Sequence, residues 1–321
     1  MSNYATLINE FIAALSIPKQ PANLYDPIRY TLSQGGKRLR PELCLIACRT
    51  LGGNMKQALH PAVALELLHN FTLIHDDIMD QSELRRGQDT VYKKWGTNTA
   101  ILAGDTMLGM AYDLILKYPA IGSSKFSTLM TTTFIQICEG QQMDIDFERR
   151  KVVPVEEYLE MIRLKTSVLL AACMKAGAIA ANGSPEFQNA FYNFGVNIGL
   201  AFQIQDDLLD VYGQTEKLGK SIGDDIATNK KTYLSTKAME LLQGEKLSAL
   251  KHYFTKNDFN RQEKFEGVKQ LYDSCGIKDI ATEQIKGYYD NAFQILDALK
   301  LKPEQTSELH EFTKRMMYRE F

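Results

Sequence analysis

Two five-residue acidic motifs are the residues whose types and spacing most clearly suggest chemistry. Residues 76–80 read Asp-Asp-Ile-Met-Asp and residues 206–210 read Asp-Asp-Leu-Leu-Asp, so both share the pattern D-D-x-x-D. Each motif follows a largely apolar stretch with the three- and four-residue spacing of a helix face. On a helix, the first and last aspartates of a motif share one face, and the second lies beside them. The two motifs therefore predict two clusters of carboxylates, each carried by a helix.

A cluster of carboxylates needs a compensating cation, because like charges repel and burial makes them more costly. One such motif also fits a solvated helix end, but two copies after apolar helices favour a binding site. Zinc prefers His or Cys ligands, and only His75 is adjacent to a motif. Mg²⁺ is typically held by one or two carboxylates with water and substrate phosphates. The motifs therefore predict Mg²⁺ binding. Gln203 joins the second face, three residues before Asp206.

Basic residues alternate with the acidic motifs along the chain and suit phosphate groups. The segment G-G-K-R-L-R-P at 35–41 has glycines that allow an anion close to the backbone, and a proline suited to a first helical turn. Lys37 and Arg40 lie three residues apart and would grip one diphosphate. A basic surface turn is the alternative for this segment, and a lone His69 is typical of a core histidine. The basic candidates beyond this segment are His69, Arg85, Arg86, Lys165, Lys220 and Lys230.

Helical periodicity runs through nearly the whole chain. Apolar residues recur at spacings of three and four, whereas the alternation typical of strands is rare. Gly and Pro fall between the periodic stretches, and no low-complexity linker divides them. The sequence predicts an all-α fold, a single domain over 1–321 built as a bundle of about ten or more helices. The periodic stretches are 99–118, 124–147, 155–181, 186–213, 230–243 and 279–299.

Composition and charge exclude several other classes of protein. The chain of 321 residues has a formal net charge of −2, which argues against nucleic-acid binding. We find no uninterrupted apolar run of about 18 residues and expect no membrane span. The N-terminal segment lacks the basic flank of a secretory signal. The five cysteines form no C-x-x-C pair, so we expect buried thiols in a reducing cytosol and a cytoplasmic protein.

The order of these motifs resembles that of the trans-isoprenyl diphosphate synthase (polyprenyl synthetase) family, short-chain type. The resemblance covers most of the chain. Four residues depart from the family's pattern: Asp89 and Tyr92 replace a usual Pro and His, Asn229 replaces a Gly and Tyr233 a Leu. The matching segments are 35–41, 69–80, 85–87, 104–105, 140–144, 165–166, 202–210, 219–220 and 230–232.

The resemblance implies an isoprenoid-synthase bundle around a central cavity and the condensation of isopentenyl diphosphate with an allylic diphosphate. Three Mg²⁺ ions would bind with substrate, Mn²⁺ would substitute, and the released diphosphate would take the proton. Metal ligands would be Asp76, Asp77, Asp80, Asp206 and Asp210. The allylic diphosphate would bind Arg85, Lys165, Lys220 and Lys230. Isopentenyl diphosphate would bind Lys37, Arg40, His69 and Arg86. The developing carbocation would be lined by Thr166 and Gln203. The family is commonly homodimeric, and we expect a homodimer here.

Product length is the least determined property. Phe71 lies ~140° around the helix from Asp76, so helix geometry alone does not place it in a tunnel, and a core aromatic is the alternative. In the family this position forms the tunnel floor. An aromatic there with the small Thr72 beside it favours geranylgeranyl diphosphate. The alternatives are farnesyl diphosphate as main product, or a subunit of a heteromeric longer-chain synthase.

Two other functions share part of this pattern. A class I terpene cyclase would share the first motif, but its second metal motif normally contains Asn or Asp, Ser or Thr, and Glu. A non-catalytic partner subunit would tend to lose aspartates, whereas both motifs are intact here. Turnover by the purified chain alone distinguishes an enzyme from such a subunit.

Overall fold

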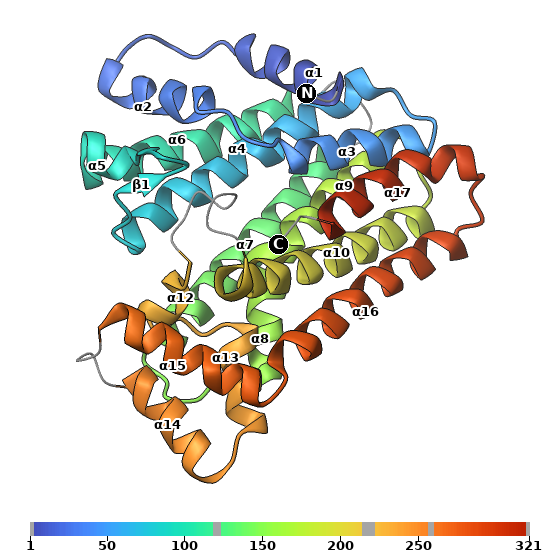
Figure 1. The fold of residues 1–321 in the computed structure, drawn as a ribbon. Coiled ribbons are helices and arrows are strands. Elements are labelled where there is room, and N and C mark those ends of the chain that lie inside the picture. Colours follow the sequence, from blue (N-terminus) through green and yellow to red (C-terminus); the bar gives the residue numbers. More distant parts are fainter. Residues whose placement is uncertain (1–2, 118–122, 214–221, 256–259, 319–321) are drawn as a thin grey trace. The chain divides into compact units, whose positions relative to one another are not determined.

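The computed structural model describes residues 3–117, 123–213, 222–255 and 260–318, and helices dominate these ranges (Figure 1). Strands within them are limited to a two-stranded antiparallel hairpin, β1 (Leu84–Arg85) and β2 (Gln88–Asp89). The expected all-α fold is therefore confirmed. The helices are α1 (Asn3–Ala13), α2 (Ala22–Ser33), α3 (Leu39–Thr50), α4 (Met55–Met79), α5 (Val91–Trp95), α6 (Thr97–Leu116), α7 (Ser123–Glu148), α8 (Val155–Ile162), η1 (Arg163–Ser167), α9 (Val168–Ala180), α10 (Pro185–Tyr212), α12 (Asp224–Ala227), α13 (Tyr233–Leu241), α14 (Gly244–Thr255), α15 (Arg261–Ser274), α16 (Ile277–Ala298) and α17 (Pro303–Met317).

The chain divides into two compact units, each with its own core. Unit 1 comprises Met1–Phe134, Leu169–Tyr192 and Leu299–Leu309, and unit 2 comprises Ile135–Val168, Asn193–Ala298 and His310–Phe321. Along the chain, the division falls within α7, α9, α10 and α17, and directly after α16. The expectation of one domain over 1–321 stays a prediction, and each unit is described by itself.

The core of unit 1 is built around α4, which packs against α3 and α6. All residues from Pro61 to Leu68 are buried, so this part of the helix is apolar nearly all round. The helix begins after Asn54, whose side chain accepts the Lys56 N–H at 3.0 Å as an N-cap. Its C-terminal turns carry the first aspartate motif. A well-packed helix thus fixes where that motif begins and which way it faces.

Unit 2 holds the second motif on α10, and a π-helical turn, η1, carries Lys165 and Thr166. Two glycines let neighbouring helices approach this turn closely. A Cβ at Gly140 of α7 would lie 2.4 Å from the Lys165 backbone nitrogen, and one at Gly199 of α10 would lie 2.6 Å from the Ser167 Cα. Only glycine permits such backbone approach. The turn is therefore clasped by a glycine from each of two helices.

The helical stretches expected from the sequence are present, and the largest boundary difference is in 230–243. Residue 118, the end of the stretch 99–118, lies outside the described residues. The stretch 230–243 forms a helix only from Tyr233. Thr232 is its N-cap: its side chain accepts the Ser235 N–H at 3.2 Å, and Ser235 accepts the Thr232 N–H in return. This capping box leaves Lys230 and Lys231 in the preceding loop.

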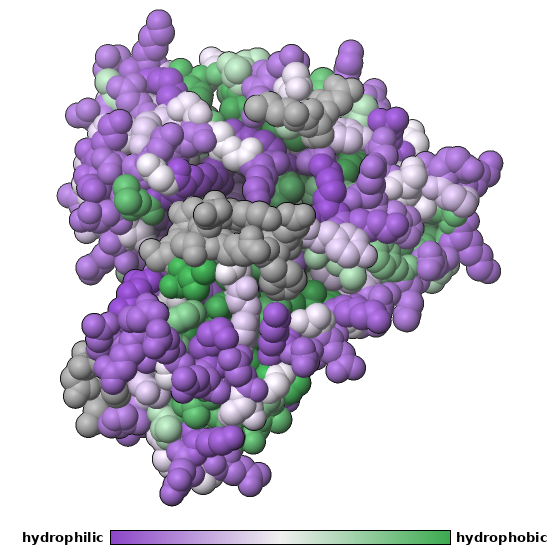
Figure 2. Space-filling model, in the orientation of Figure 1, coloured by the Kyte–Doolittle hydropathy of each residue, from purple (hydrophilic) through white to green (hydrophobic). Residues whose placement is uncertain are grey.

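The surface in view is mostly hydrophilic (Figure 2), and the five cysteines follow the expectation of burial only in part. Hydrophilic side chains cover most of the face drawn in Figure 2, and hydrophobic ones appear as separate areas. All five cysteines are free, and Cys44, Cys48 and Cys173 are buried as expected. The expectation of burial is wrong for Cys138, which is exposed on α7, and for Cys275, which is partly exposed as the C-cap of α15.

Within the described residues, α6 is the one helix long and apolar enough to cross a membrane, and 33% of its apolar stretch is buried. Length and composition are weak support for a span, because a core helix meets the same criteria. Asp105 and Asp113 interrupt this helix. The absence of a membrane span stays our expectation.

Candidate active site

The first aspartate motif ends α4 with two accessible carboxylates and one buried carboxylate. Asp80 is exposed and Asp76 half-buried, whereas Asp77 is 4% exposed. Arg85 Nε donates to Asp77 Oδ1 at 2.8 Å, and Arg85 Nη2 lies 2.8 Å from the same oxygen in an ion pair. Burial raises the pKa of Asp77 to about 6, and the nearby Arg85 charge opposes that rise. The middle aspartate of this motif thus holds an arginine that the sequence assigned to substrate.

The hairpin β1–β2 presents Arg85 and Arg86. Its two-residue turn is Arg86-Gly87, and both residues have positive φ, 55° and 75°, as in the type I′ turns of tight hairpins. Its base is fixed by Thr90, whose hydroxyl donates to the Ser82 carbonyl at 2.8 Å, and by Tyr30, whose hydroxyl donates to the Asp89 carbonyl at 2.8 Å. These bonds hold the two arginines on a short, well-anchored element.

Asp89, one of the departures from the family's pattern, has a structural role in this chain. Lys93 lies 3.3 Å from the Asp89 carboxylate and 3.0 Å from that of Glu83. The lysine thereby links Glu83, which precedes β1, to Asp89 at the end of β2. These pairs are exposed, so each contributes little stability alone.

The basic turn at 35–41 lies against the hairpin in unit 1. Arg86 donates from Nη1 to the Gly35 carbonyl, and a Cβ at Gly36 would lie 2.8 Å from the same nitrogen. Burial, and then the charges of Arg40, Arg86 and Arg85, hold the pKa of His69 well below its usual value. The structure therefore brings three predicted anion-binding arginines together around the neutral imidazole of His69, and Lys37 is exposed on the basic turn.

Arg38 and Glu66 form a buried ion pair that the sequence analysis did not identify. Arg38 is 4% exposed and its backbone is left-handed, with φ of 49°. Its guanidinium donates to Glu66 at 2.8 Å, to the Leu32 carbonyl at 3.0 Å and to Asn9 at 3.1 Å. These bonds fix the turn on which Lys37 and Arg40 stand. A carboxylate inside the apolar stretch A-L-E-L-L is the sequence signal that could have identified Glu66.

The second aspartate motif repeats the arrangement with different partners. Asp206 and Asp210 are half-buried, and Asp207 is 2% exposed. Asp207 accepts the Tyr158 hydroxyl, the Tyr233 N–H at 2.9 Å and the Gln203 Nε2–H at 3.2 Å. Burial, followed by the neighbouring Asp225 charge, raises the pKa of Asp207 to about 7. Its direct partners are neutral donors, in contrast to the arginine on Asp77.

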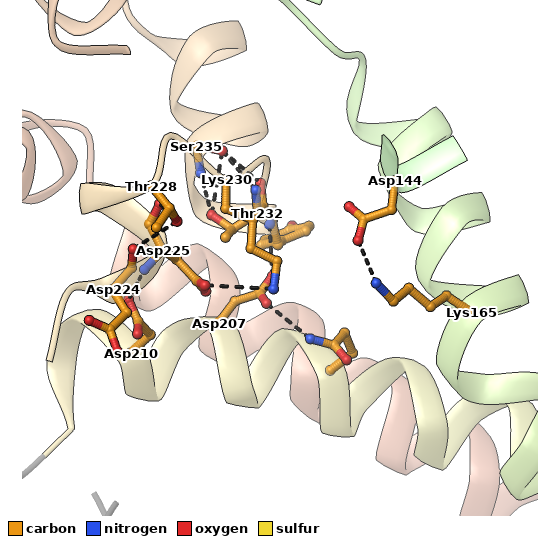
Figure 3. A network of polar contacts seen from close by, with 12 residues as sticks. Asp144, Lys165, Asp207, Asp210, Asp224, Asp225, Thr228, Lys230, Thr232 and Ser235 are labelled. Atoms are coloured by element: carbon orange, nitrogen blue, oxygen red, sulfur yellow. Dashed lines mark hydrogen bonds and ion pairs between the residues drawn. The ribbon is translucent and has the colours of Figure 1, made fainter. Parts of the chain in front are cut away.

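Asp210 connects this motif to the N-cap and first turn of α12. Its Oδ2 accepts the Asp225 N–H at 3.2 Å, and its carbonyl accepts the Gly223 N–H at 2.8 Å. Burial, and then the charge of Asp225, raises the pKa of Asp210 to about 7. The Asp225 carboxylate lies 3.6 Å from Lys230 Nζ (Figure 3). The motif and Lys230 therefore belong to one polar network, whereas Lys220 lies outside the described residues.

Lys165 and Thr166 occupy neighbouring positions on η1 but have separate partners. Lys165 Nζ donates to Asp144 of α7 at 2.6 Å (Figure 3). The Thr166 hydroxyl donates to Gln203 Oε1 at 3.1 Å. The Thr166–Gln203 pair was expected from the resemblance to line one site, and the structure brings the two side chains into contact. Asp144 is the last residue of the matching segment 140–144, and the sequence did not reveal its pairing with Lys165.

Asn229 precedes Lys230 with a φ of 60°, in the left-handed region where glycine and asparagine are tolerated best. Its Oδ1 accepts from Lys264 Nζ at 2.6 Å, and Lys264 is 5% exposed. Burial lowers the pKa of Lys264. Asn229, which replaces the family's usual glycine, is thus held in its left-handed conformation by the hydrogen bond from Lys264.

Phe71 lies in an aromatic cluster between α4, α6 and α7 of unit 1. Its ring centroid is 5.6 Å from that of Phe134 and 4.5 Å from that of His75. A Cβ at Gly104 would lie 3.3 Å from the Phe71 ring. Thr72 is half-buried, and its hydroxyl donates to the His69 carbonyl of its own helix at 2.8 Å. The aromatic side chain is thus held in place by its neighbours.

The carboxylates of the two motifs fit Mg²⁺ better than a metal that needs three or more protein ligands. Among the described residues, no three His, Cys, Asp or Glu side chains converge on one point. Mg²⁺ needs only one or two carboxylates when substrate phosphates and water complete its octahedron. Asp76 with Asp80, and Asp206 with Asp210, each offer two accessible carboxylates one helical turn apart.

Comparisons with known proteins agree with this description. Residues 21–273 match the polyprenyl synthetase family. The geranylgeranyl pyrophosphate synthase of Geoglobus acetivorans is 39% identical over 303 residues, covering 94% of this chain and 92% of that protein. The chain therefore belongs to the polyprenyl synthetase family.

Solved structures support the same family. A crystal structure of a geranylgeranyl pyrophosphate synthase is 42% identical and superposes with a TM-score of 0.94, covering 98% of both chains. A structure of geranylgeranyl pyrophosphate synthase from Corynebacterium glutamicum, complexed with isoprenyl diphosphate and magnesium, is 26% identical with a TM-score of 0.86 over 99% of this chain and 97% of that one.

Proposed function

We propose that this protein is a geranylgeranyl diphosphate synthase, which condenses isopentenyl diphosphate with dimethylallyl, geranyl or farnesyl diphosphate. The observation that carries the proposal is 39% identity, over most of the chain, with a geranylgeranyl pyrophosphate synthase. Both aspartate motifs are intact, which supports an active enzyme over a non-catalytic subunit.

In unit 1, Asp76 and Asp80 would supply carboxylate oxygens to Mg²⁺, with Asp77 holding Arg85 toward the allylic diphosphate. The cluster around His69 would bind isopentenyl diphosphate through charge-assisted hydrogen bonds. Its members are Lys37, Arg40, His69 and Arg86. The neutral His69 adds a donor without adding to the repulsion among the arginines.

In unit 2, Asp206 and Asp210 would supply the second set of carboxylates, and Lys165 and Lys230 would bind the allylic diphosphate with Lys220. Mg²⁺, when bound, neutralises the charge that develops on the leaving diphosphate. Thr166 and Gln203 would face the allylic carbon that becomes positive, and their oxygens would stabilise it. Apolar helices around these groups would exclude water, which otherwise quenches the cation.

Incubation of the purified chain with labelled isopentenyl diphosphate and each allylic diphosphate tests the proposal. We expect products of up to twenty carbons with Mg²⁺, and weaker activity with Mn²⁺. The matched control is Asp206→Ala under the same conditions. No condensation product with any allylic partner would refute the proposal, and a cyclic hydrocarbon released from the allylic diphosphate alone would favour the terpene cyclase.

Phe71 would set the product length as the floor of the chain tunnel. Because its ring packs on Phe134 and Gly104, removing it opens space next to α4 without disturbing the aspartates directly. We expect Phe71→Ala to lengthen the products beyond twenty carbons, and Thr72→Phe to shorten them toward farnesyl diphosphate. Chromatography of the dephosphorylated products measures both. Unchanged distributions in both variants would show that another residue forms the floor.

We also propose a cytoplasmic homodimer that pairs through α6. Its side chains Ile101 and Leu102 are 40% and 57% exposed, which is a large apolar area to leave in water. The three buried free thiols suit a reducing compartment. Light scattering at micromolar concentration is expected to give twice the mass of 36.3 kDa, and Leu102→Lys to give the monomer.

A further inference from the structure

A continuous chain of hydrogen bonds in unit 2 links two buried residues to the residues proposed to face the cation. The Tyr158 hydroxyl donates to Asp207 Oδ2, and Asp207 Oδ1 accepts from Gln203 Nε2 at 3.2 Å. Gln203 Oε1 then accepts from the Thr166 hydroxyl at 3.1 Å. Neither Tyr158 nor Asp207 has a role in the proposed function.

The other hydrogen bonds of Asp207 decide which end of the Gln203 amide faces it. Asp207 Oδ2 already accepts from the Tyr158 hydroxyl and the Tyr233 N–H, and Oδ1 is left as an acceptor that pairs with the NH₂ end of the amide and not with its carbonyl end. The carbonyl oxygen of Gln203 must then point the other way, where it takes the hydroxyl proton of Thr166. The Gln203 carbonyl oxygen and the Thr166 hydroxyl oxygen are thereby left with lone pairs, rather than hydrogens, toward the proposed position of the allylic carbon.

Oxygens that present lone pairs are what a developing carbocation needs, because fixed dipoles stabilise charge without reorganising. A flipped Gln203 would aim two N–H groups in their place and would oppose positive charge. The carboxylate also polarises the amide, since hydrogen bonds in a chain reinforce one another. The orientation of one amide therefore sets the sign of the local field.

Asp207 is itself held by neutral groups. Its Oδ2 accepts from Tyr158, which is 2% exposed, and from the Tyr233 N–H at the first turn of α13. A helix N-terminus favours an anion without neutralising it. An arginine in this position, as on Asp77, would cancel much of the field at Gln203.

We propose that Tyr158 and Asp207 are positioning residues that orient Gln203, and through it Thr166, for stabilisation of the allylic cation. The inference rests on the proposed prenyl transfer and deepens it, because it names the residues that determine how the site treats positive charge.

Binding of two allylic analogues tests this role. The first is an ammonium diphosphate, in which a charged nitrogen replaces the carbon that becomes positive. The second is a thiolodiphosphate, which carries the same diphosphate group but no charge on its allylic part. For Asp207→Asn we expect about ten- to hundredfold weaker ammonium binding, and for Tyr158→Phe about three- to tenfold. Thiolodiphosphate binding should stay within about twofold of the original chain, and kcat should fall with little change in KM.

Thr236→Val is the matched control, because it removes a buried hydroxyl of α13 that donates to the Thr232 carbonyl at 2.9 Å. It should lower the melting temperature and leave the ammonium-to-thiolo ratio unchanged. Equal weakening of both analogues by Tyr158→Phe, or no weakening of either, would overturn the inference. If Asp207→Asn does not fold, Tyr158→Phe decides the question. Absence of turnover in the original chain would instead refute the proposed function.

Discussion

The two aspartate motifs have the same spacing but hold their middle carboxylates by opposite means. In α4, Asp77 is bound by the charged Arg85, which closes a hairpin onto the helix. In α10, Asp207 is bound by a tyrosine hydroxyl, a backbone N–H and an amide. A cation neutralises a buried carboxylate, whereas neutral donors leave its charge in place. The same motif therefore places a basic side chain in unit 1 and sets the direction of a dipole in unit 2.

The first and largest expected effect concerns what the motifs share. Replacing Asp76 or Asp206 by alanine removes an accessible carboxylate from a proposed Mg²⁺ site, and we expect kcat to fall by about two orders of magnitude or more. Steady-state kinetics at saturating Mg²⁺ measure the loss. Full activity of the original chain in excess chelator would contradict a metal-dependent role for either motif.

A second prediction separates the two middle aspartates. Asp77→Asn weakens the hold on Arg85, so we expect KM for the allylic diphosphate to rise about tenfold, with a smaller change in kcat. Tyr158→Phe, which removes a hydrogen bond to Asp207 of the other motif, should act on kcat instead. Glu83→Gln is the control on the hairpin, because its exposed pair with Lys93 contributes little. A kcat effect at both motifs alike would erase the distinction.

The pH dependence of stability offers a third test. The pKa of Asp207 is raised from 3.8 to about 7, so the folded protein binds a proton that the unfolded chain has lost between these values. That stabilising difference is complete below pH 3.8 and is lost as pH rises through about 7. In urea unfolding of the metal-free protein, Asp207→Asn should remove on the order of 2 kcal/mol of this decline. Asp77→Asn should affect a narrower window that ends near pH 6. A parallel pH profile in original and variant chains would show that Asp207 is not the group responsible.

The smallest effect concerns the loop that carries Lys230. Asn229→Ala loses the bond to Lys264 and places a Cβ residue at positive φ, so we expect about 1–3 kcal/mol lower unfolding free energy. Asn229→Gly should cost less, because glycine adopts this backbone freely. Thermal unfolding compares the two. Equal losses would mean that the hydrogen bond, and not the backbone conformation, accounts for the effect of Asn229.

The sequence predicts the helices and the faces of both motifs because these depend on residues three and four positions apart. The partners of the middle aspartates depend on tertiary contacts instead. Tyr158 lies 49 residues from Asp207, and Tyr233 lies 26 away. No local spacing indicates such pairs. The resemblance identified Arg85 as a diphosphate ligand, but only the folded hairpin reveals that it also binds Asp77.

The π-helical turn that carries Lys165 and Thr166 could not be predicted from the sequence for a similar reason. A continuous helical pattern over 155–181 gives no sign that one turn is wider, and the glycines that allow it stand on α7 and α10. The start of α13, by contrast, could have been predicted from the sequence. Thr232 and Ser235 form a capping box, although with serine in place of the usual acidic residue.

The glycine clasp around η1 has a consequence for engineering this protein. Gly140 and Gly199 set the distance between their helices and η1. Any side chain at either position would clash with the backbone of η1 and displace Lys165 and Thr166 from their partners. A library that varies all residues near the substrate is therefore expected to be depleted at these two codons, whatever product is selected. Variation is better directed to Phe71 and its aromatic neighbours, where added or removed volume alters space and leaves the backbone where it is.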